Sequence, residues 1–426
     1  MGTEISLSID DVDVCWSKNS MGIDHGSLFQ PKDRKRFKSD QVNYDYFDAE
    51  LSKMEIGFIK KLKDVIPRLE LMGITLDSVR KEYNFAAVES DETQKYLESD
   101  GLTDGKPCMD FDSFLEIIQT INLASLDGSY DSSSVDKEPA DYGKSFIDKE
   151  AIKAIPHYDP QDWMVYSEKS LVSSLVGFLS PYSALRLLVE SKQHLDLDVK
   201  WQYGPLVENG WANASMFQPS ARRTQKFLIV TEGHTDAEIL DLAIKTLRPE
   251  IHDFFCFIDM TEGHPFGGTG NLQKFAKGLV KMDVQNKTLF LYDNDTEGLS
   301  VYRNTSRFNL PNNMRVVMLP DLEEFSSFQT DGPTGEKKVN INGKAVAIEC
   351  YLDHSRSGLP KTPTIRWSGY KGDVKQYQGA LVDKDMYTKD FLRHTPERLL
   401  SSGYDLTKLQ QVVDMIFREC VKIACS

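Results

Sequence analysis

The chain has 426 residues, of which 40% are hydrophobic and 27% are charged, and its formal net charge is −15. This length favours two or three domains, and the composition is typical of a globular chain rather than a disordered one. No apolar run approaches the ~18 residues that a membrane-spanning helix needs. The strong negative charge argues against a protein that coats nucleic acid through bulk charge.

The cysteines and the distribution of charge bear on metal binding, location and the surface that could meet a polyanion. Six cysteines are scattered without a CxxC pair, so no zinc ribbon is predicted and a reducing cytoplasm is the expected location. Residues 333–398 hold 12 Lys/Arg and 8 Asp/Glu, a local charge of +4, so the remainder carries −15 − 4 = −19. This basic part is compatible with a groove for a polyanion and equally with an ordinary solvated surface.

The N-terminal half predicts a β-hairpin followed by helices. Apolar and polar residues alternate on both sides of the Asp10-Asp11 turn, which is typical of two paired strands. Thr75 is expected to cap a short helix, and Ser180-Pro181 to open another. Residues 124–145 are acidic and serine-rich, which predicts a loop or linker. The other helices are predicted at 46–66, 112–122, 168–179 and 181–192.

From Lys226 onward, short apolar strands alternate regularly with helices. Such continuous apolar strands are typical of a parallel sheet covered on both faces. The sequence therefore predicts an α/β unit here. The strands are predicted at 226–231, 253–259, 288–295 and 314–319, and the helices at 235–247, 270–282 and 296–307.

Acidic residues follow two of these strands. Glu232 ends the first strand, with Asp236 one turn later, and the third strand ends at Asp293 and Asp295. Residues i and i+2 of an extended segment point the same way, so the last two carboxylates project together and Asn294 is opposed. Parallel strands meet with their carboxyl ends at one edge. Converging carboxylates repel one another, and oxygen-only ligands favour one or two Mg²⁺ or Mn²⁺ ions.

The segments "VTEGHTD" (230–236) and "LYDNDTEG" (291–298) resemble the two signatures of the Toprim domain. The resemblance implies that Glu232 acts as an acid/base or metal ligand, and that Asp293 and Asp295 hold metal. Two further segments, "AVAIECYLD" (345–353) and "ALVDKDMYTKDFL" (380–392), resemble the C-terminal part of OLD-family Toprim nucleases. They imply an additional acid at Glu349 and a catalytic lysine, which is either Lys384 or Lys389.

The N-terminal part carries a second resemblance. "MGTEISLSIDDVDVCWSKN" (1–19) and "IPRLELMGITLDSVRKEYN" (66–84) are similar to the HEPN/Toprim-associated N-terminal domain of predicted anti-phage proteins. No active HEPN ribonuclease site is expected, because no Arg is followed by His after four to six residues; Arg186 and His194 have seven between them. The Gly-rich segment 262–271 is expected to form either a rim of the Toprim site or a plain turn.

These observations predict an α/β fold in three parts. An N-terminal α+β domain (1–220) precedes a Toprim core with a central parallel sheet flanked by helices (221–322) and an OLD-like extension (323–426). The predicted function is a Mg²⁺- or Mn²⁺-dependent nuclease in anti-phage defence, with DNA favoured over RNA. An ATPase or other defence partner in trans and a homo-oligomer are further expectations, and no membrane association is expected. The alternatives are a catalytically silent Toprim module that binds nucleic acid or protein, and a nucleotidyl-transferring enzyme.

Overall fold

The computed structural model describes residues 2–38, 54–99, 107–130, 137–258, 269–333, 335–360, 362–372 and 374–426. The chain divides into two compact units, Met1–Ala221 with Cys425 and Arg222–Ala424 with Ser426, called unit 1 and unit 2 below. Each unit has its own hydrophobic core. The expectations for residues 46–53 and for most of the Gly-rich segment fall outside the described residues.

Unit 1 contains an antiparallel sheet in the order β2-β1-β5-β4-β3. The predicted hairpin is confirmed, because β1 and β2 pair around Asp10 and Asp11, which both adopt the left-handed conformation that a tight turn needs. The alternating residues Ile5, Leu7 and Ile9 are buried. The strands are β1 (Glu4–Ile9), β2 (Val12–Lys18), β3 (Arg34–Arg36), β4 (Ile56–Lys61) and β5 (Asp198–Gln202).

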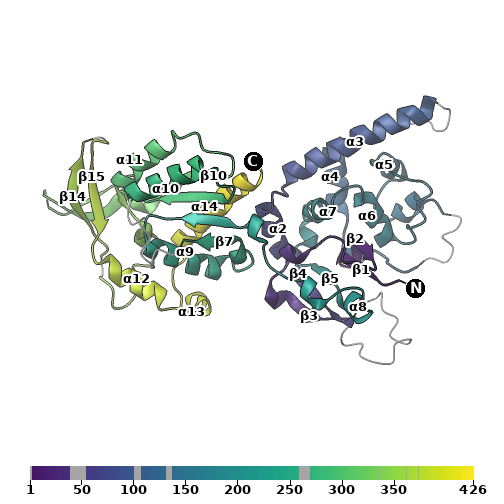
Figure 1. The fold of residues 1–426 in the computed structure, drawn as a ribbon, viewed down its shortest axis with the longest axis horizontal. Helices are drawn as coiled ribbons and strands as arrows, with labels where there is room; N and C mark the ends of the chain where they lie inside the picture. The colour runs from purple at the N-terminus through teal and green to yellow at the C-terminus, as the bar shows by residue number, and fades with distance from the viewer. Residues whose placement is uncertain are drawn as a thin grey trace. The chain divides into compact units, whose positions relative to one another are not determined.

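Helices complete unit 1 (Figure 1). The predicted start at Ser180 is confirmed, since its hydroxyl accepts from the Ser183 N–H and Pro181 occupies the first turn. Among the described residues no single helix could cross a membrane; only α6 and α7 taken together, as a bent pair, pass that test. The helices are α2 (Leu62–Leu71), α3 (Leu76–Ser99), α4 (Phe111–Thr120), α5 (Lys149–Lys153), α6 (Glu168–Val176), α7 (Pro181–Leu188) and α8 (Gly204–Glu208).

The amphipathic helix predicted for 46–66 is wrong over 56–61, which form strand β4 between β3 and β5, and is confirmed at its end, where Leu62 begins α2. The apolar spacing that suggested a helix also suits a strand that continues into α2. Phe58 stacks on Phe29 and lies against Trp201, so tertiary packing decides the outcome. Gly57 was an overlooked signal: a side chain there would meet the Trp201 carbonyl oxygen at 2.8 Å.

Two further expectations in unit 1 need correction. Thr75 does cap a helix, through its hydroxyl and the Ser78 N–H, but α3 is 24 residues long rather than short. Its second half is polar and rich in good helix formers, so its helicity does not show in an apolar repeat. The segment 124–145 is not wholly an irregular linker. Residues Pro139–Gly143 form a 3-10 helix, and Ala140 is fully buried in the core of unit 1.

Unit 2 contains the predicted parallel sheet, with strand order β10-β8-β6-β7. Helices α10 and α11 cover one face, and α9 and α14 cover the other (Figure 1). This confirms the alternating strand-helix pattern. The elements are β6 (Phe227–Val230), α9 (His234–Leu247), β7 (Phe255–Phe257), α10 (Thr269–Lys281), β8 (Lys287–Tyr292), α11 (Thr296–Thr305), β10 (Met314–Met318) and α14 (Thr407–Ala424).

The remaining segments of unit 2 attach to the acidic end of this sheet. The two-residue strand β9 (Asn294–Asp295) pairs with β13 (Ala345–Val346). Buried Asn294 donates to Asp321 and accepts from the Gly343 N–H, so its side chain ties the core to the later residues. A second sheet, in the order β12-β11-β14-β15, follows. The other elements are β11 (Phe328–Asp331), β12 (Lys337–Val339), β14 (Ile365–Lys371), β15 (Gln376–Leu381), α12 (Lys384–Leu392) and α13 (Pro396–Ser401).

Candidate functional site at the edge of the parallel sheet

The ends of β6 and β8 are joined by a carboxylate. The two strands are neighbours, with Val230 opposite Phe290, so the chain just beyond them meets at one edge. The Asp293 N–H donates to Glu232 Oε1 at 3.0 Å, and the Thr269 hydroxyl donates to Oε2 at 2.7 Å. Glu232 is therefore held by the residue that follows β8, the neighbouring strand in the sheet, and by the first residue of α10. This is the arrangement that parallel connectivity predicts.

The second acidic turn is fixed by Asp295 and Gly298. Asp295 is the N-cap of α11, and its Oδ1 accepts from the Gly298 N–H at 2.7 Å. A Cβ atom on Gly298 would lie 2.2 Å from the Asp293 carbonyl oxygen, which is backbone and has no rotamer to change. At Gly233, by contrast, the nearest atom would be 3.5 Å away, an ordinary contact. Of the two motif glycines, only Gly298 therefore has a steric reason to be glycine.

We predict that Gly298→Ala lowers the melting temperature and that Gly233→Ala does not. The clash at Gly298 must move the turn that carries the acids, and overpacking of this kind costs about 1–3 kcal/mol, or roughly 3–10 °C. The Gly233 variant serves as the matched control, with a change below about 2 °C. Scanning calorimetry of the two variants measures this, and equal melting temperatures would contradict the steric argument.

Two more acids reach the same edge from other elements. Asp236, in the first turn of α9, accepts from the Gly233 N–H at 3.0 Å. Glu349 lies in a short 3-10 helix, Ile348–Tyr351, and is only 3% exposed. Its Oε1 contacts Lys384 Nζ at 3.0 Å, and Lys384 is the first residue of α12. The ammonium group of Lys384 therefore lies beside this group of carboxylates.

The acids act on one another electrostatically, with Asp293 at the centre. Burial raises the pKa of Asp293 well above its usual value, and the charges of Asp236, Glu232, Asp295 and Glu349 raise it further. Burial likewise raises the pKa of Glu232 to about 7 and that of Asp236 to about 7. The edge of the sheet therefore holds more negative charge than its own cation offsets.

Lys384 responds to these acids in the opposite sense. Burial acts to lower its pKa, but the carboxylates of Glu349, Asp236 and Asp293 raise it overall. The ammonium group therefore stays charged. Lys389, the other predicted lysine, is exposed, and within the described residues its side chain makes no ion pair with the acids.

We predict that, in EDTA, Glu232→Gln raises the melting temperature at pH 7.5 and leaves it unchanged at pH 4.5. Glutamine can keep both hydrogen bonds, because its oxygen accepts from the Asp293 N–H and its nitrogen can donate to Thr269. The folded-state pKa lies above the ordinary 4.5, so the cost of ionising Glu232 is absent at low pH and grows as the pH rises to about 7.

The expected gain at pH 7.5 is roughly 3–6 °C. It follows from ~1.4 kcal/mol per pKa unit, discounted by about half for residual solvent screening. Thermal melts of both proteins at the two pH values measure it. A gain of equal size at both pH values, or none at pH 7.5, would show that the charge of Glu232 is not the cause.

The donor chemistry fits a hard divalent cation, but the geometry is not that of a finished metal centre. The five acids offer only carboxylate oxygens, which Mg²⁺ and Mn²⁺ prefer, and their mutual repulsion is what a cation would relieve. Among the described residues, however, no group of three or more His, Cys, Asp or Glu side chains is arranged to hold a metal ion. Four of the carboxylates accept hydrogen bonds within the chain, and each has further lone pairs.

The structure thus brings together most of the residues that the sequence singled out. It groups the acids and Lys384, and it leaves Lys389 apart; His234 faces Glu238 at 3.2 Å instead of the acids. Two contacts were missed. Thr269 lies at the end of the Gly-rich segment expected to form the rim, and Gln378 of β15 donates to Asp295 Oδ2. No sequence pattern marked Gln378. The grouped acids are Glu232, Asp236, Asp293, Asp295 and Glu349.

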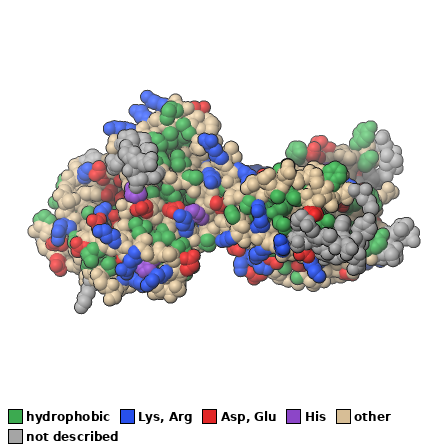
Figure 2. All heavy atoms as spheres, turned by 60° about the horizontal axis from the view of Figure 1, so that its bottom comes forward, with side chains coloured by type: hydrophobic (Ala, Val, Ile, Leu, Met, Phe, Trp, Pro, Cys, Tyr) green, Lys and Arg blue, Asp and Glu red, His purple; other side chains and the backbone are tan. Residues whose placement is uncertain are grey.

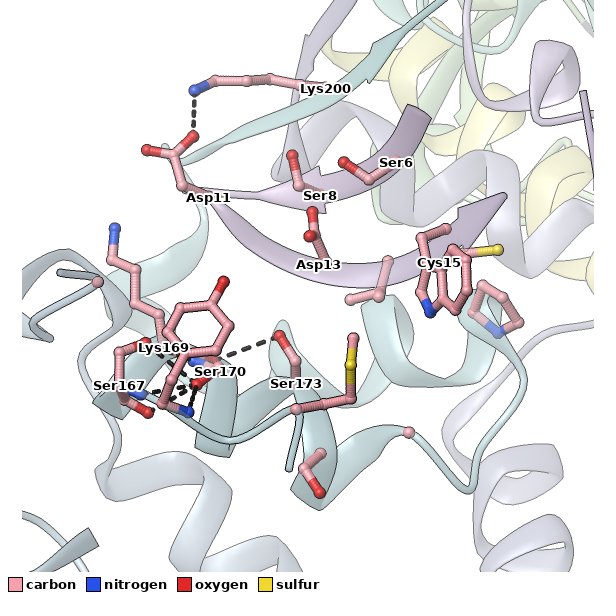
Figure 3. A pocket seen from close by; sticks show the side chains of 18 of the residues that line it. Ser6, Ser8, Asp11, Asp13, Cys15, Ser167, Lys169, Ser170, Ser173 and Lys200 are labelled. Carbon is pink, nitrogen blue, oxygen red and sulfur yellow. Dashed lines mark hydrogen bonds and ion pairs between the residues drawn. The ribbon is translucent and has the colours of Figure 1, made fainter. Parts of the chain in front are cut away.

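A hollow of about 880 Å³ lies in unit 1 (Figure 3). It is lined by polar residues of β1 and β2 and by a row of serines from α6. Two of its lysines already have partners: Lys200 contacts Asp11 at 2.8 Å, and Lys169 donates to the Asp10 carbonyl oxygen at 2.7 Å. Two of its acids are bonded to serines, Asp162 to Ser174 and Asp13 to Ser6. The acid cluster of unit 2, where several carboxylates converge, is therefore the stronger candidate site.

Arg186 and His194 have structural roles in unit 1. The ring of His194 is buried, and its two nitrogens contact the Leu188 carbonyl oxygen and the Leu123 N–H. Arg186 contacts the carboxylate of Glu190. These contacts account for both residues without any catalytic role.

Comparison with known protein families gives a match. The family model described as HEPN/Toprim N-terminal domain 1 matches residues 1–225, more than half of the chain. This confirms the resemblance drawn from segments 1–19 and 66–84. No curated protein and no solved structure matches the chain.

Proposed function

Because the chain belongs to the HEPN/Toprim N-terminal domain 1 family, we propose that unit 2 is a Toprim nuclease domain that hydrolyses phosphodiester bonds with Mg²⁺ or Mn²⁺. Membership of this family suggests a function connected with nucleic acid. One observation carries the finer proposal: four carboxylates, from the turn after β6, from α9, from the turn after β8 and from a 3-10 helix, surround Asp293 at the carboxyl edge of a parallel sheet. Fold likeness alone would not support an activity.

In this proposal Asp293, Asp295, Asp236 and Glu349 hold the cation, with Glu232 as a further ligand. When bound, the cation neutralises the phosphate and activates water. We assign the proton transfer to Glu232: its pKa is about 7 in the metal-free chain, so its carboxylate can accept and return a proton near neutral pH wherever the cation does not neutralise it.

Lys384 has a different task in this proposal. A lysine cannot bind the cation, but its ammonium, poised between Glu349 and the solvent with 52% of its side chain exposed, can offset charge that develops on the phosphate. The ion pair with Glu349 fixes the start of α12 beside the acids. Lys389 has no corresponding contact within the described part of the chain.

The test is incubation of the purified full chain with linear and circular DNA and with RNA, in Mg²⁺, Mn²⁺ or EDTA. We expect metal-dependent cleavage that EDTA stops, with DNA cut faster than RNA. Absence of any detectable cleavage with every substrate and metal, even at low salt and with protein in excess over substrate, in protein that is folded by circular dichroism, would overturn the nuclease proposal.

A second candidate is a catalytically silent Toprim module that binds nucleic acid or a partner protein. It is favoured by one observation: no ready-made metal site exists among the described residues, and the chain's own groups already occupy several carboxylate oxygens. Isothermal titration with Mg²⁺ and Mn²⁺ separates the two candidates, because a silent module with satisfied carboxylates should bind neither ion in the millimolar range.

Charge suggests that the isolated chain has low activity. The net charge is −15, and acidic and basic side chains are mixed over the face of unit 2 that Figure 2 shows. Few phosphates can then be neutralised, so binding is weak and sensitive to salt. We propose that a partner, such as an ATPase acting in trans, or self-assembly in anti-phage defence positions the chain on its substrate. Strong, salt-insensitive cleavage by the isolated chain would contradict this.

A further inference from the structure

The hairpin formed by β14 and β15 is bonded directly to the acidic turn. Gln378 of β15 donates to Asp295, and its own Oε1 accepts from the Glu297 N–H at 3.0 Å. The Thr296 hydroxyl donates to the Tyr377 carbonyl oxygen at 2.9 Å. Three contacts therefore hold this hairpin beside the residues that carry the proposed metal ligands.

The two faces of the hairpin differ. Gln378 and Lys371 lie on the face toward α11, where Lys371 contacts Glu297 at 3.4 Å. Side chains alternate along a strand, so the directly opposed pair Tyr370 and Tyr377 stands on the other face. Their rings are 5.2 Å apart and T-shaped, and the residues are 57% and 55% exposed. Cross-strand pairing explains why they meet but leaves much of both rings in water.

Cations belong to the same sheet as this aromatic pair. Lys375 precedes β15 in the chain, and β12 contributes Lys337 and Lys338, all three exposed. Arg366 of β14 is not counted with them, because it contacts Asp331 and, opposite Ala380, lies on the face of Gln378. Aromatic rings that stack on bases, beside cations that meet the phosphates, are how proteins bind single strands without reading sequence. A paired duplex buries its base faces in its own stack and offers the rings little.

We propose that the β14–β15 hairpin binds unpaired bases of a nucleic-acid strand, with Tyr370 and Tyr377 as the stacking surface next to the acid cluster. The inference rests on the proposed function and deepens it, because it assigns a single-stranded or locally unpaired substrate. The hairpin is the structural link: Gln378 fixes the acidic turn, and the adjacent residue Tyr377 contacts the base.

Binding is tested without catalysis. Fluorescence anisotropy in EDTA compares a labelled 20-nucleotide single strand with the duplex of the same sequence, at low salt, using the full chain. The double variant Tyr370→Ala/Tyr377→Ala should lose about tenfold or more in affinity for the single strand and less than twofold for the duplex. The Tyr370→Phe/Tyr377→Phe variant, which keeps the rings, should bind like the unaltered chain. Tyr96→Ala, at a tyrosine of α3 that is 70% exposed, is the matched control.

The outcomes separate this inference from the nuclease proposal. Unchanged single-strand binding by the double alanine variant, an equal loss for strand and duplex, or no binding by the unaltered chain overturns the hairpin's role. If the chain cleaves nucleic acid with metal but the tyrosine variants bind normally, only the inference fails. If the hairpin-dependent binding appears but no metal supports cleavage, the nuclease proposal fails and the strand-binding surface stands.

Discussion

We expect Asp293→Ala to abolish metal-dependent cleavage while the fold of unit 2 survives. Asp293 lies where the charges of four other acids converge, so it is the carboxylate that a cation there would most need. Even indirect partners of metal ligands are worth ~10–100-fold in affinity or activity, so loss of a direct ligand should exceed about 100-fold. Asp293→Asn should fail as well, because the amide keeps an oxygen but loses the charge.

Stability distinguishes this loss from unfolding. Removing the central carboxylate relieves repulsion, so the Asp293 variants should melt at or above the temperature of the unaltered chain in EDTA at pH 7.5. Added Mg²⁺ should stabilise the unaltered chain more than the variants. Asp241→Asn is the control, since this acid of α9, the helix that carries Asp236, pairs instead with Lys245 and His252. Cleavage assays and melts with and without Mg²⁺ measure both effects, and full activity in Asp293→Ala would sink the nuclease assignment.

The parallel sheet could be predicted because its signals are local. Each strand is a short apolar run that ends at a polar turn, and the helices between them repeat at 3.6 residues. The position of Glu232 beside Asp293 then follows from connectivity, since neighbouring parallel strands end at the same edge. The glycine of the second motif has an equally local cause, the close approach of Gly298 to the Asp293 carbonyl oxygen.

Other parts depend on contacts between distant segments, which a single sequence does not reveal. Glu349 joins the site from 54 residues beyond Asp295, and only the family resemblance suggested it. Gln378 lies on a strand with no motif, and it belongs to the site because it hydrogen-bonds with Asp295 and Glu297. The helix predicted over 56–61 is wrong for the same reason. Phe58 of β4 is placed by its contacts with Trp201 and Phe29, which are distant in the sequence.

The second large effect concerns the lysines, which the sequence left undecided. We predict that Lys384→Ala slows cleavage about 100-fold or more and that Lys389→Ala leaves it within about twofold. The ammonium of Lys384 lies 3.0 Å from Glu349 and is drawn to Asp236 and Asp293, whereas Lys389 makes no ion pair with these acids in the described part of the chain. Loss of a preorganised charge aimed at a developing oxyanion typically costs ~10²–10³-fold in turnover.

The two lysines differ by position on one helix, which makes them a matched pair. Both are on α12 and each variant removes one positive charge, although Lys384 begins the helix and Lys389 lies in its last turn, where the helix dipole favours a cation. Lys384→Ala also leaves Glu349, which is 3% exposed, without its cation, so the variant's melting temperature should fall in EDTA and recover partly when Mg²⁺ is added. Lys384→Arg keeps the charge and should retain stability while it loses part of the rate.

Single-turnover cleavage and metal titration on the three variants decide the matter. Equal rates in Lys384→Ala and Lys389→Ala would remove the lysine from the mechanism, whereas slow cleavage with normal metal affinity in Lys384→Ala alone would assign it to the phosphate.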